Sequence, residues 1–380
     1  MSVICRTDKG WVISHYDYTK KIYTNVVSRS GDVELAYNKN LFHILTPLMR
    51  DQEARNFIKS LSEKEFVISQ EIKMKKRSRS ASFDHEISII QSALKELVEI
   101  AQNRGYFSFK PTNVHYEENN SLARSTSELY NGESFASEIN FSGGNSSTSP
   151  IVVKTFERDY VIPPLCSFVC CDIGNINTEL SGKTFDFILL DPPWWNKFIR
   201  RKKAKHSGKG YKMMANLNIQ DVPVSKFLNK FGLVGIWCTN APSHIDAVRE
   251  KFLNKWGLVY VSTWYWVKVT QSGETVNPFR GETEKRPYER LIFACLEGRH
   301  FKNPEPERCI VSVPSAIHSH KPPLVEILRE YLPENPACLE LFARYLLPGW
   351  TSVGNQVLDL QCLSLFDKLE SVRPLEGSDN

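Results

Sequence analysis

The feature that most constrains the fold is an alternation of apolar strands and amphipathic helices, which begins near residue 151. Ligands of such α/β sheets bind beyond the carboxyl ends of the strands. The alternation predicts a mostly parallel sheet covered on both faces. The expected strands are Leu165–Ile173, Phe185–Leu190, Leu233–Thr239, Leu258–Val269, Arg290–Leu296, Cys309–Val313 and Ala337–Phe342. Helices are expected over Pro242–Lys255 and Pro322–Tyr331.

The part of the chain before residue 151 does not show this regular alternation of strands and helices. Short strands are expected over Ile22–Val27 and Asp32–Tyr37, and helical spacing of apolar residues predicts a helix over Asp84–Arg104. We predict an α+β N-terminal accessory domain over residues 1–116, whose candidate role is either nucleic-acid binding or bracing of the pocket. Residues 117–150 are rich in Ser, Asn, Glu and Gly, which predicts a linker or a mobile loop. The catalytic domain is then expected over residues 151–365 and a C-terminal tail over 366–380.

Charge and cysteine content restrict the class of protein. The net charge is +5, and the nine cysteines show no zinc-type spacing. They predict buried, reduced thiols and an intracellular protein. No apolar run approaches the roughly 20 residues that span a bilayer, so we expect a soluble protein without a membrane segment. His318 and His320 have no third ligand at a suitable spacing, so no metal is expected.

A rigid polar turn follows one of the expected strands. Phe185–Leu190 runs into Asp191-Pro192-Pro193-Trp194. Proline offers no N–H, so this loop presents carbonyl oxygens and the Asp191 carboxylate as acceptors. Such acceptors suit an exocyclic amino group, and Trp194 offers a flat face on which a base could stack. The alternative interpretation is an ordinary strand-ending turn.

Several motifs in the second part of the chain occur together in a family order. They are Cys171-Asp172-Ile173, Asp191–Trp194, Trp237–Asn240, Trp266–Lys268, Ser319–Pro322, Glu340–Arg344 and Gly354–Gln356. Residues 160–360 thereby resemble the Asp-Pro-Pro-Trp family of eukaryotic N6-adenine methyltransferases, the family of the mRNA adenosine methyltransferase catalytic subunit. The resemblance implies a Rossmann-like domain that uses S-adenosyl-L-methionine. It also implies a permuted motif order, in which the catalytic loop comes before the usual first cofactor motif.

The resemblance implies roles for individual residues. The catalytic residues would be Asp191, Pro192, Pro193 and Trp194. The cofactor would be bound by Asp172, Ile173, Asp191, Lys285, Glu340, Leu341, Arg344, Asn355 and Gln356, with Tyr288 as the alternative to Lys285 at the cofactor carboxylate. Two features depart from the family pattern: Leu341–Arg344 contains no glycine, and the spacing from Arg344 to Asn355 is short.

Two loops are candidate substrate contacts. Residues 196–214 follow the catalytic motif directly and are strongly basic, which indicates a path for a phosphate backbone rather than only a solvated surface. Residues 270–289 are expected to face this loop across the pocket. The predicted substrate-binding residues are Trp194, Trp195, Asn196, Arg200, Arg201, Lys202, Lys203, Lys205, Tyr211, Asn240, Arg280, Arg286 and Tyr288.

These observations favour an S-adenosylmethionine-dependent N6-adenine methyltransferase that releases S-adenosyl-L-homocysteine and needs no metal. The resemblance favours small nuclear RNA of the U2 type as substrate, at an internal adenosine with or without a 2′-O-methyl group. DNA is the alternative substrate, and a catalytically silent RNA-binding partner subunit is the alternative of another class. The basic segment Lys73–Ser80 is either a solvated loop or a nuclear-localisation or nucleic-acid patch. We expect a monomer in the nucleus, with the cytoplasm as a second location.

Overall fold

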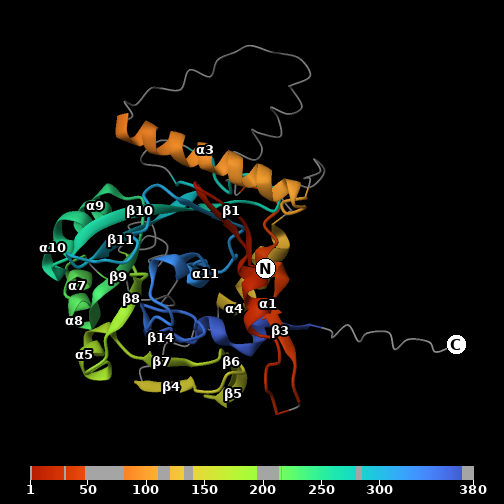
Figure 1. The fold of residues 1–380 in the computed structure, drawn as a ribbon. Helices are drawn as coiled ribbons and strands as arrows, with labels where there is room; N and C mark the ends of the chain where they lie inside the picture. The colour runs from red at the N-terminus through yellow and green to blue at the C-terminus, as the bar shows by residue number, and fades with distance from the viewer. Residues whose placement is uncertain are drawn as a thin grey trace, which may run out of the picture.

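A mixed eleven-stranded sheet forms the centre of the molecule (Figure 1). The computed structural model describes residues 2–29, 31–47, 81–109, 120–131, 140–194, 214, 216–279 and 285–369. The strands are, in sheet order, β1 (Val3–Thr7), β2 (Gly10–Ile13), β12 (Cys309–Ser312), β10 (Val259–Lys268), β11 (Tyr288–Cys295), β9 (Leu228–Cys238), β8 (Phe185–Leu190), β13 (Cys338–Leu341), β14 (Trp350–Val353), β7 (Cys166–Cys170) and β4 (Phe141–Asn145).

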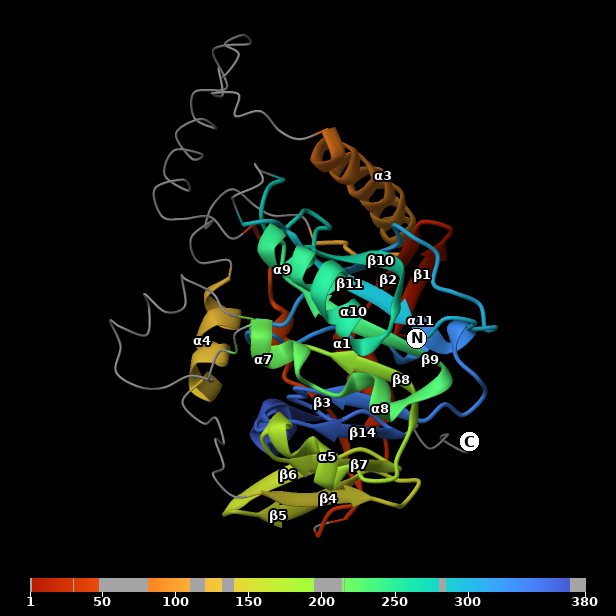
Figure 2. The same ribbon diagram turned by 90° about the vertical axis from the view of Figure 1, so that its left-hand side faces the viewer.

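Most neighbouring strands of this sheet are parallel. Strands β9, β8, β13, β14 and β7 form one continuous parallel block. Strand β11 lies between β10 and β9 and is antiparallel to both. Strand β4 is the edge strand beside β7 and is antiparallel to it. Figure 2 shows this order from β4 and β7 at one end of the sheet to β10 and β1 at the other. The predicted α/β architecture with a mostly parallel sheet is therefore confirmed.

Strand β8 shows how the sheet divides the core. Phe187 and Leu189 belong to one apolar cluster, and Ile188 and Leu190 belong to another. Side chains alternate along a strand, so each set faces one side of the sheet. On the second side the cluster includes residues of α5 (Ile176–Glu179), α7 (Asn216–Gln220), α8 (Val224–Phe227), the π-helix η3 (Ala247–Phe252) and α10 (Leu253–Trp256). On the first side it includes residues of α1 (His15–Ile22), α3 (Ala81–Asn103) and α11 (Val325–Leu328).

The N-terminal residues are part of this body, which differs from the expected accessory domain over 1–116. Strand β2 hydrogen-bonds to β12 in parallel, and β1 continues the sheet outward. The helix α3 was expected over Asp84–Arg104 and forms over Ala81–Asn103, where it packs against β1, β2 and β12. The physical reason is that these elements bury their apolar faces on the main sheet instead of on one another.

Three other expectations are corrected at the level of elements. The segment Ile22–Val27 is not a strand, because α1 ends at Ile22 and the segment makes two isolated bridges, from Val26 to Val33 and from Val27 to Ile151. The expected linker 117–150 contains the helix α4 (Ser121–Asn131) and the edge strand β4. The expected tail begins with a strand, since β15 (Phe366–Leu369) pairs with β3 (Glu34–Tyr37). Residues 366–369 are therefore part of the folded body.

The remaining short elements lie around the sheet. They are the hairpin β5 (Ile151–Thr155) and β6 (Arg158–Ile162), the helix α9 (Pro242–Asp246), and the 3₁₀ turns η1 (Lys39–Phe42), η2 (Ile173–Asn175), η4 (Arg329–Tyr331), η5 (Asp359–Gln361) and η6 (Leu363–Leu365). Among the helices that the structure describes, none has the length and apolar character needed to cross a membrane.

Candidate active site

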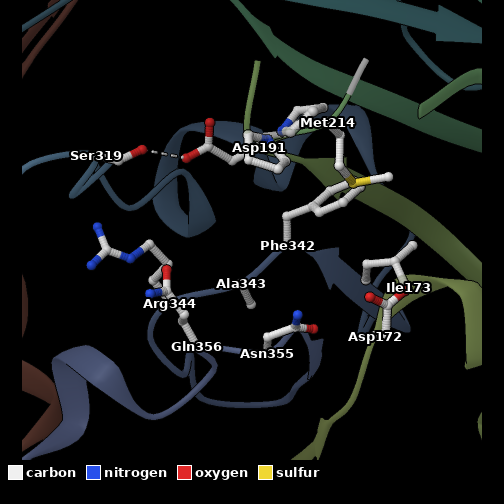
Figure 3. Close-up of a pocket in the computed structure, with 12 residues that line it drawn as sticks. Asp172, Ile173, Asp191, Met214, Ser319, Phe342, Ala343, Arg344, Asn355 and Gln356 are labelled. Atoms are coloured by element: carbon white, nitrogen blue, oxygen red, sulfur yellow. Dashed lines mark hydrogen bonds between the residues drawn. The ribbon is translucent and has the colours of Figure 1, made fainter. Parts of the chain in front are cut away.

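A pocket lies at the edge of the sheet where four parallel strands end. Strands β7, β8, β13 and β14 run in the same direction, so the residues that follow them meet at one edge. The empty space in the pocket amounts to about 770 Å³, which includes open solvent at its mouth. Its lining residues are Asp172, Ile173, Asp191, Pro192, Pro193, Met214, Ser319, Phe342, Ala343, Arg344, Asn355 and Gln356 (Figure 3).

Each strand contributes the residues directly after its last position. Asp172 and Ile173 follow β7, and the Asp172 carboxylate caps the turn η2 by accepting from the Gly174 N–H at 2.8 Å. Asn355 and Gln356 follow β14. Asp191 and Asp172 lie on opposite sides of the pocket (Figure 3). The pocket therefore collects most of the residues that the sequence proposed for cofactor binding.

The turn after β13 shows why the absence of a glycine there is tolerated. Phe342 adopts a left-handed backbone conformation with φ of +63°. A side chain at Gly354 would approach the carbonyl oxygen of Ala343 to 2.8 Å, so glycine at that position lets the end of β14 pass close to the turn. The glycine that allows the two backbones to come close therefore follows β14, at Gly354, and not in the turn after β13.

Glu340 and Leu341 behave differently from the other proposed cofactor residues. Both lie within β13, buried in the sheet, and neither is among the lining residues. One carboxyl oxygen of Glu340, Oε2, has no hydrogen-bond partner in the part of the chain that the structure describes. Burial raises the pKa of Glu340 to about 8, and the neighbouring negative charge of Asp191 adds to the effect. Glu340 is therefore largely protonated at neutral pH.

Asp191 is partly buried at the end of β8, with its side chain 11% exposed, and has two partners. The Ser319 hydroxyl donates to Asp191 Oδ2 at 3.0 Å, and the Lys321 ammonium lies 3.0 Å from the same oxygen. Burial raises the pKa of Asp191 above its usual value, while Lys321 and Ser319 oppose that rise. The structure thus supplies a desolvated carboxylate whose charge is balanced by one cation.

Lys321 is a site residue to which the sequence interpretation gave no role. Its ammonium also lies 3.4 Å from Glu289, which is ion-paired in turn with Lys268. Burial alone would lower the pKa of Lys321, but the carboxylates of Asp191 and Glu289 raise it above its ordinary value. The sequence did contain a signal for Lys321, because Ser319–Pro322 was one of the motifs that match the family. The lysine at the pocket was nevertheless assigned to Lys285.

Neither Lys285 nor the alternative Tyr288 is among the residues that line the pocket. Tyr288 is 1% exposed, and its hydroxyl donates to Glu86 Oε1 at 2.6 Å. That bond ties Tyr288 to α3 instead of to the pocket. The buried cation beside Asp191 is Lys321.

The position of Trp194 contradicts the expected base-stacking role. Its ring is 6% exposed and packs on His244 and Phe252, with centroids 4.8 and 6.0 Å away. The indole N–H donates to the Trp237 carbonyl oxygen at 2.9 Å. Trp194 is therefore an anchor that fixes the turn after β8, because its faces and its donor are already used within the core.

The carbonyl groups of the turn remain suited to accepting hydrogen bonds. The Trp194 N–H donates to the Pro192 oxygen at 2.8 Å, and the Met214 N–H donates to the Pro193 oxygen at 3.0 Å. A carbonyl oxygen has two lone pairs, so each can accept one more donor. Met214 also closes one side of the pocket.

Three predicted substrate residues meet in a buried polar network with α3. Glu86 accepts hydrogen bonds from Arg290 and Tyr288 and lies 3.7 Å from Arg286. Asn240 accepts from Arg290 and donates to the Tyr288 carbonyl oxygen at 2.5 Å. Asn240, Arg286 and Tyr288 are thus brought together as predicted, but their polar groups mainly hold the edge of the sheet to α3. Sequence reasoning missed Glu86, which is one of many acidic residues on an amphipathic helix.

The remaining substrate predictions lie outside the residues that the structure describes. They are Trp195, Asn196, Arg200, Arg201, Lys202, Lys203, Lys205, Tyr211 and Arg280, together with the basic segment 73–80. Within the described ranges, no group of three or more His, Cys, Asp or Glu side chains is arranged to hold a metal ion. His320 is buried and His318 is exposed, and desolvation together with nearby cations lowers the pKa of both.

The fold and pocket define an α/β protein with an open pocket at the carboxyl edge of its parallel strands. Residues 185–356 of the chain match the family model MT-A70. This range includes Asp191, Lys321 and Arg344 but not Asp172. The resemblance stated from the motifs is confirmed at this level.

Three curated relatives are similar to the chain. The mouse N(6)-adenine-specific methyltransferase METTL4 is 38% identical over 238 residues, which cover 60% of this chain and 49% of the relative. The N6-methyladenosine RNA methyltransferase MTA1 of Pyricularia oryzae is 36% identical over 57% of this chain and 59% of its own length. A DNA N6-methyl methyltransferase of Caenorhabditis elegans is 33% identical over 57% and 58%.

The chain spans about half the length of the METTL4 relative that it matches. The names of the relatives share adenine N6 methylation and differ in the nucleic acid, since one is called an RNA enzyme and another a DNA enzyme.

Proposed function

We propose that the protein is an S-adenosylmethionine-dependent methyltransferase that modifies the N6 amino group of adenine in a nucleic acid, with Asp191 at its reaction centre. The observation that carries the proposal is the partly buried Asp191 carboxylate, held by Ser319 and Lys321 in the wall of a pocket at the carboxyl edge of the sheet. The match to the MT-A70 family model and the names of the relatives support the same reaction. The catalytic motif precedes Glu340–Arg344 in the chain, which supports a permuted motif order.

The residues of the pocket fit S-adenosylmethionine. Asp172 and Asn355 offer polar groups at the ends of β7 and β14, where the adenosine part would be held with Ile173 as an apolar contact. The Arg344 Nε has no hydrogen-bond partner within the described chain, although its guanidinium also lies 3.6 Å from Asp359. Lys321 contacts Asp191 in the pocket wall without lining the pocket itself, and we propose that it binds the carboxylate of the methionine part. When bound, S-adenosylmethionine supplies an electrophilic methyl group.

The chain's own residues then position the acceptor amine. Asp191 accepts one N–H of the amine, and the second lone pair of the Pro192 carbonyl oxygen accepts the other. This arrangement directs the nitrogen lone pair away from the turn and towards the pocket. Catalysis is therefore positioning and electrostatics, and Asp191 receives the proton that the nitrogen loses as the new bond forms.

Asp191 must be ionised to accept the amine, which links activity to pH. Burial raises its pKa, so protonation begins at a higher pH than for an ordinary aspartate. Activity should accordingly fall as the pH is lowered towards this raised pKa. Lys321 opposes this rise in the pKa of Asp191 and so favours the charged form of the carboxylate.

The substrate that we propose is RNA, and more narrowly small nuclear RNA of the U2 type at an internal adenosine. The basic residues 196–214 support a polynucleotide, because Lys and Arg supply most of the affinity for a phosphate backbone. DNA is the second candidate, favoured by the similarity to the relative from C. elegans. We also propose that the protein acts as a monomer and is found in the nucleus, the latter on the basic segment 73–80.

A side-by-side assay tests the substrate. The purified protein is incubated with labelled S-adenosylmethionine and oligonucleotides of one sequence, made as RNA, as RNA with a 2′-O-methyl group on the target adenosine, and as DNA. Label that mass spectrometry locates on adenine N6 of RNA supports the proposal. Transfer to DNA alone would replace RNA by DNA. Failure to bind S-adenosylmethionine in calorimetry would favour the catalytically silent RNA-binding subunit.

A further inference from the structure

Ser319 is held in a conformation that its sequence does not favour. Its φ is +61°, in the left-handed region that residues with a β-carbon rarely adopt and keep only when the surroundings enforce it. In this conformation its hydroxyl donates to Asp191 and accepts from the Lys321 ammonium, each at 3.0 Å. The strained residue therefore connects the two charged groups of the reaction centre.

The adjacent residue, His320, is locked on the opposite side of the loop. It is 4% exposed and packs among aromatic rings. The ring centroids lie at 5.0 Å for Tyr37, 5.5 Å for His15, 5.6 Å for Tyr345 and 6.3 Å for Phe42, mostly in edge-on or tilted geometry. Three of these four rings belong to the first 42 residues of the chain.

A backbone hydrogen bond joins the same two segments a few residues away. The Ala316 N–H donates to the Leu41 carbonyl oxygen at 2.7 Å. The loop that carries Ser319 and Lys321 is thus bound twice to residues 15–42, which we name the N-terminal brace. Neither contact reaches the pocket, because none of the brace residues is among those that line it.

We propose that His320 is a positioning residue, and that the N-terminal brace holds Ser319 and Lys321 against Asp191 by enclosing the His320 ring. Because His320 lies between the two residues that contact Asp191, a shift of its ring moves both contacts together. The beginning of the chain is on this account a part of the reaction centre. Of the two roles expected from the sequence, this proposal specifies the pocket-bracing one, through named contacts, and not the nucleic-acid-binding one.

Two tyrosines of the brace provide a matched pair of variants. Tyr37 and Tyr23 both pack on Phe366, and their hydroxyls hydrogen-bond to the neighbouring residues Leu360 and Gln361, each at 2.9 Å. Of the two rings, that of Tyr37 packs on His320. Tyr37→Leu and Tyr23→Leu should therefore destabilise the protein to a similar extent and differ in their effect on the loop.

Tyr37→Leu is expected to lower kcat by about 10- to 100-fold, the loss typical of misplaced catalytic groups, with little change in the oligonucleotide KM. As the pH is lowered, kcat of this variant should begin to fall at a higher pH than kcat of the wild type. The reason is that Asp191 loses part of its contact with Lys321, which raises the pKa of Asp191 further. Tyr23→Leu should keep the wild-type kcat and pH profile. Equal kcat values and equal pH profiles for the two variants would overturn the proposal.

A second pair tests the ring itself. His320→Ala should reproduce the loss in kcat, and His320→Phe should restore most of it, because an aromatic ring again fills the enclosure. An alanine variant with wild-type turnover would contradict the positioning role.

The kinetic readout rests on the proposed function, so the affinity for S-adenosylhomocysteine is measured by calorimetry on the same proteins. If the wild type transfers no methyl group, the proposed function fails. In that case, a loss of affinity for S-adenosylhomocysteine in Tyr37→Leu but not in Tyr23→Leu would still support the role of the N-terminal brace. Equal affinities of the two variants would refute it.

Discussion

The buried carboxyl of Glu340 predicts an unusual dependence of stability on pH. Its pKa is about 8 in the folded protein, compared with about 4.5 for an exposed glutamate. The folded state binds this proton more tightly than the unfolded state, so the contribution to stability is complete below the unfolded pKa. It is lost as the pH rises towards the folded pKa, by about 1.4 kcal/mol for each pH unit between these values.

Glu340→Gln removes the titration and keeps the shape of the side chain. Between pH 5.5 and pH 7.5, roughly two units within the window, the wild type should lose about 3 kcal/mol relative to this variant. The difference in free energy of unfolding is measured by urea denaturation at both pH values, so that other titrating groups cancel. Glu334→Gln, at an exposed position, serves as the control and should show no such difference. Parallel pH profiles for wild type and Glu340→Gln would refute the reasoning.

Two further predictions concern residues that hold the site. Glu86→Ala should destabilise the protein by about 3–5 kcal/mol in urea denaturation, because it leaves two buried arginines without their carboxylate. The control is Glu99→Ala, at an exposed position of α3, which should lower the free energy of unfolding far less. Equal losses of stability in the two variants would argue against the network. Trp194→Phe should keep the oligonucleotide KM and lose only the indole hydrogen bond, about 1 kcal/mol. A large rise in KM with unchanged stability would restore the base-stacking role of Trp194.

The central strands could be predicted because their side chains are constrained on both faces. Phe185–Leu190 was expected and observed with the same bounds, since a continuous apolar run in an α/β chain can only be a buried strand. Strand β14 was not anticipated, because Trp350–Val353 is short and contains Thr351 and Ser352. Strand β4 contains Gly143 and Gly144, which favour a loop on composition alone. Pairing with β7 decides its structure, and pairing is not visible in a local pattern.

The pocket was predictable to the extent that its residues directly follow strands. Asp172, Asp191 and Asn355 each come after a parallel strand, so topology alone brings them to one edge. The burial of Trp194 and the placement of Lys321 were not predictable. Both depend on contacts between segments far apart in the sequence, such as the indole bond to Trp237.

The account depends most directly on Asp191, and the turnover of Asp191→Asn tests it. The asparagine keeps the size of the side chain and removes the charge that accepts the amine and pairs with Lys321. Methyl transfer to adenine N6 is measured by mass spectrometry at saturating S-adenosylmethionine, after calorimetry has shown that the variant still binds S-adenosylhomocysteine. The account predicts a loss of about 100-fold or more in kcat, as for other groups that act on the developing charge. A variant that binds the cofactor and retains the wild-type kcat would contradict it.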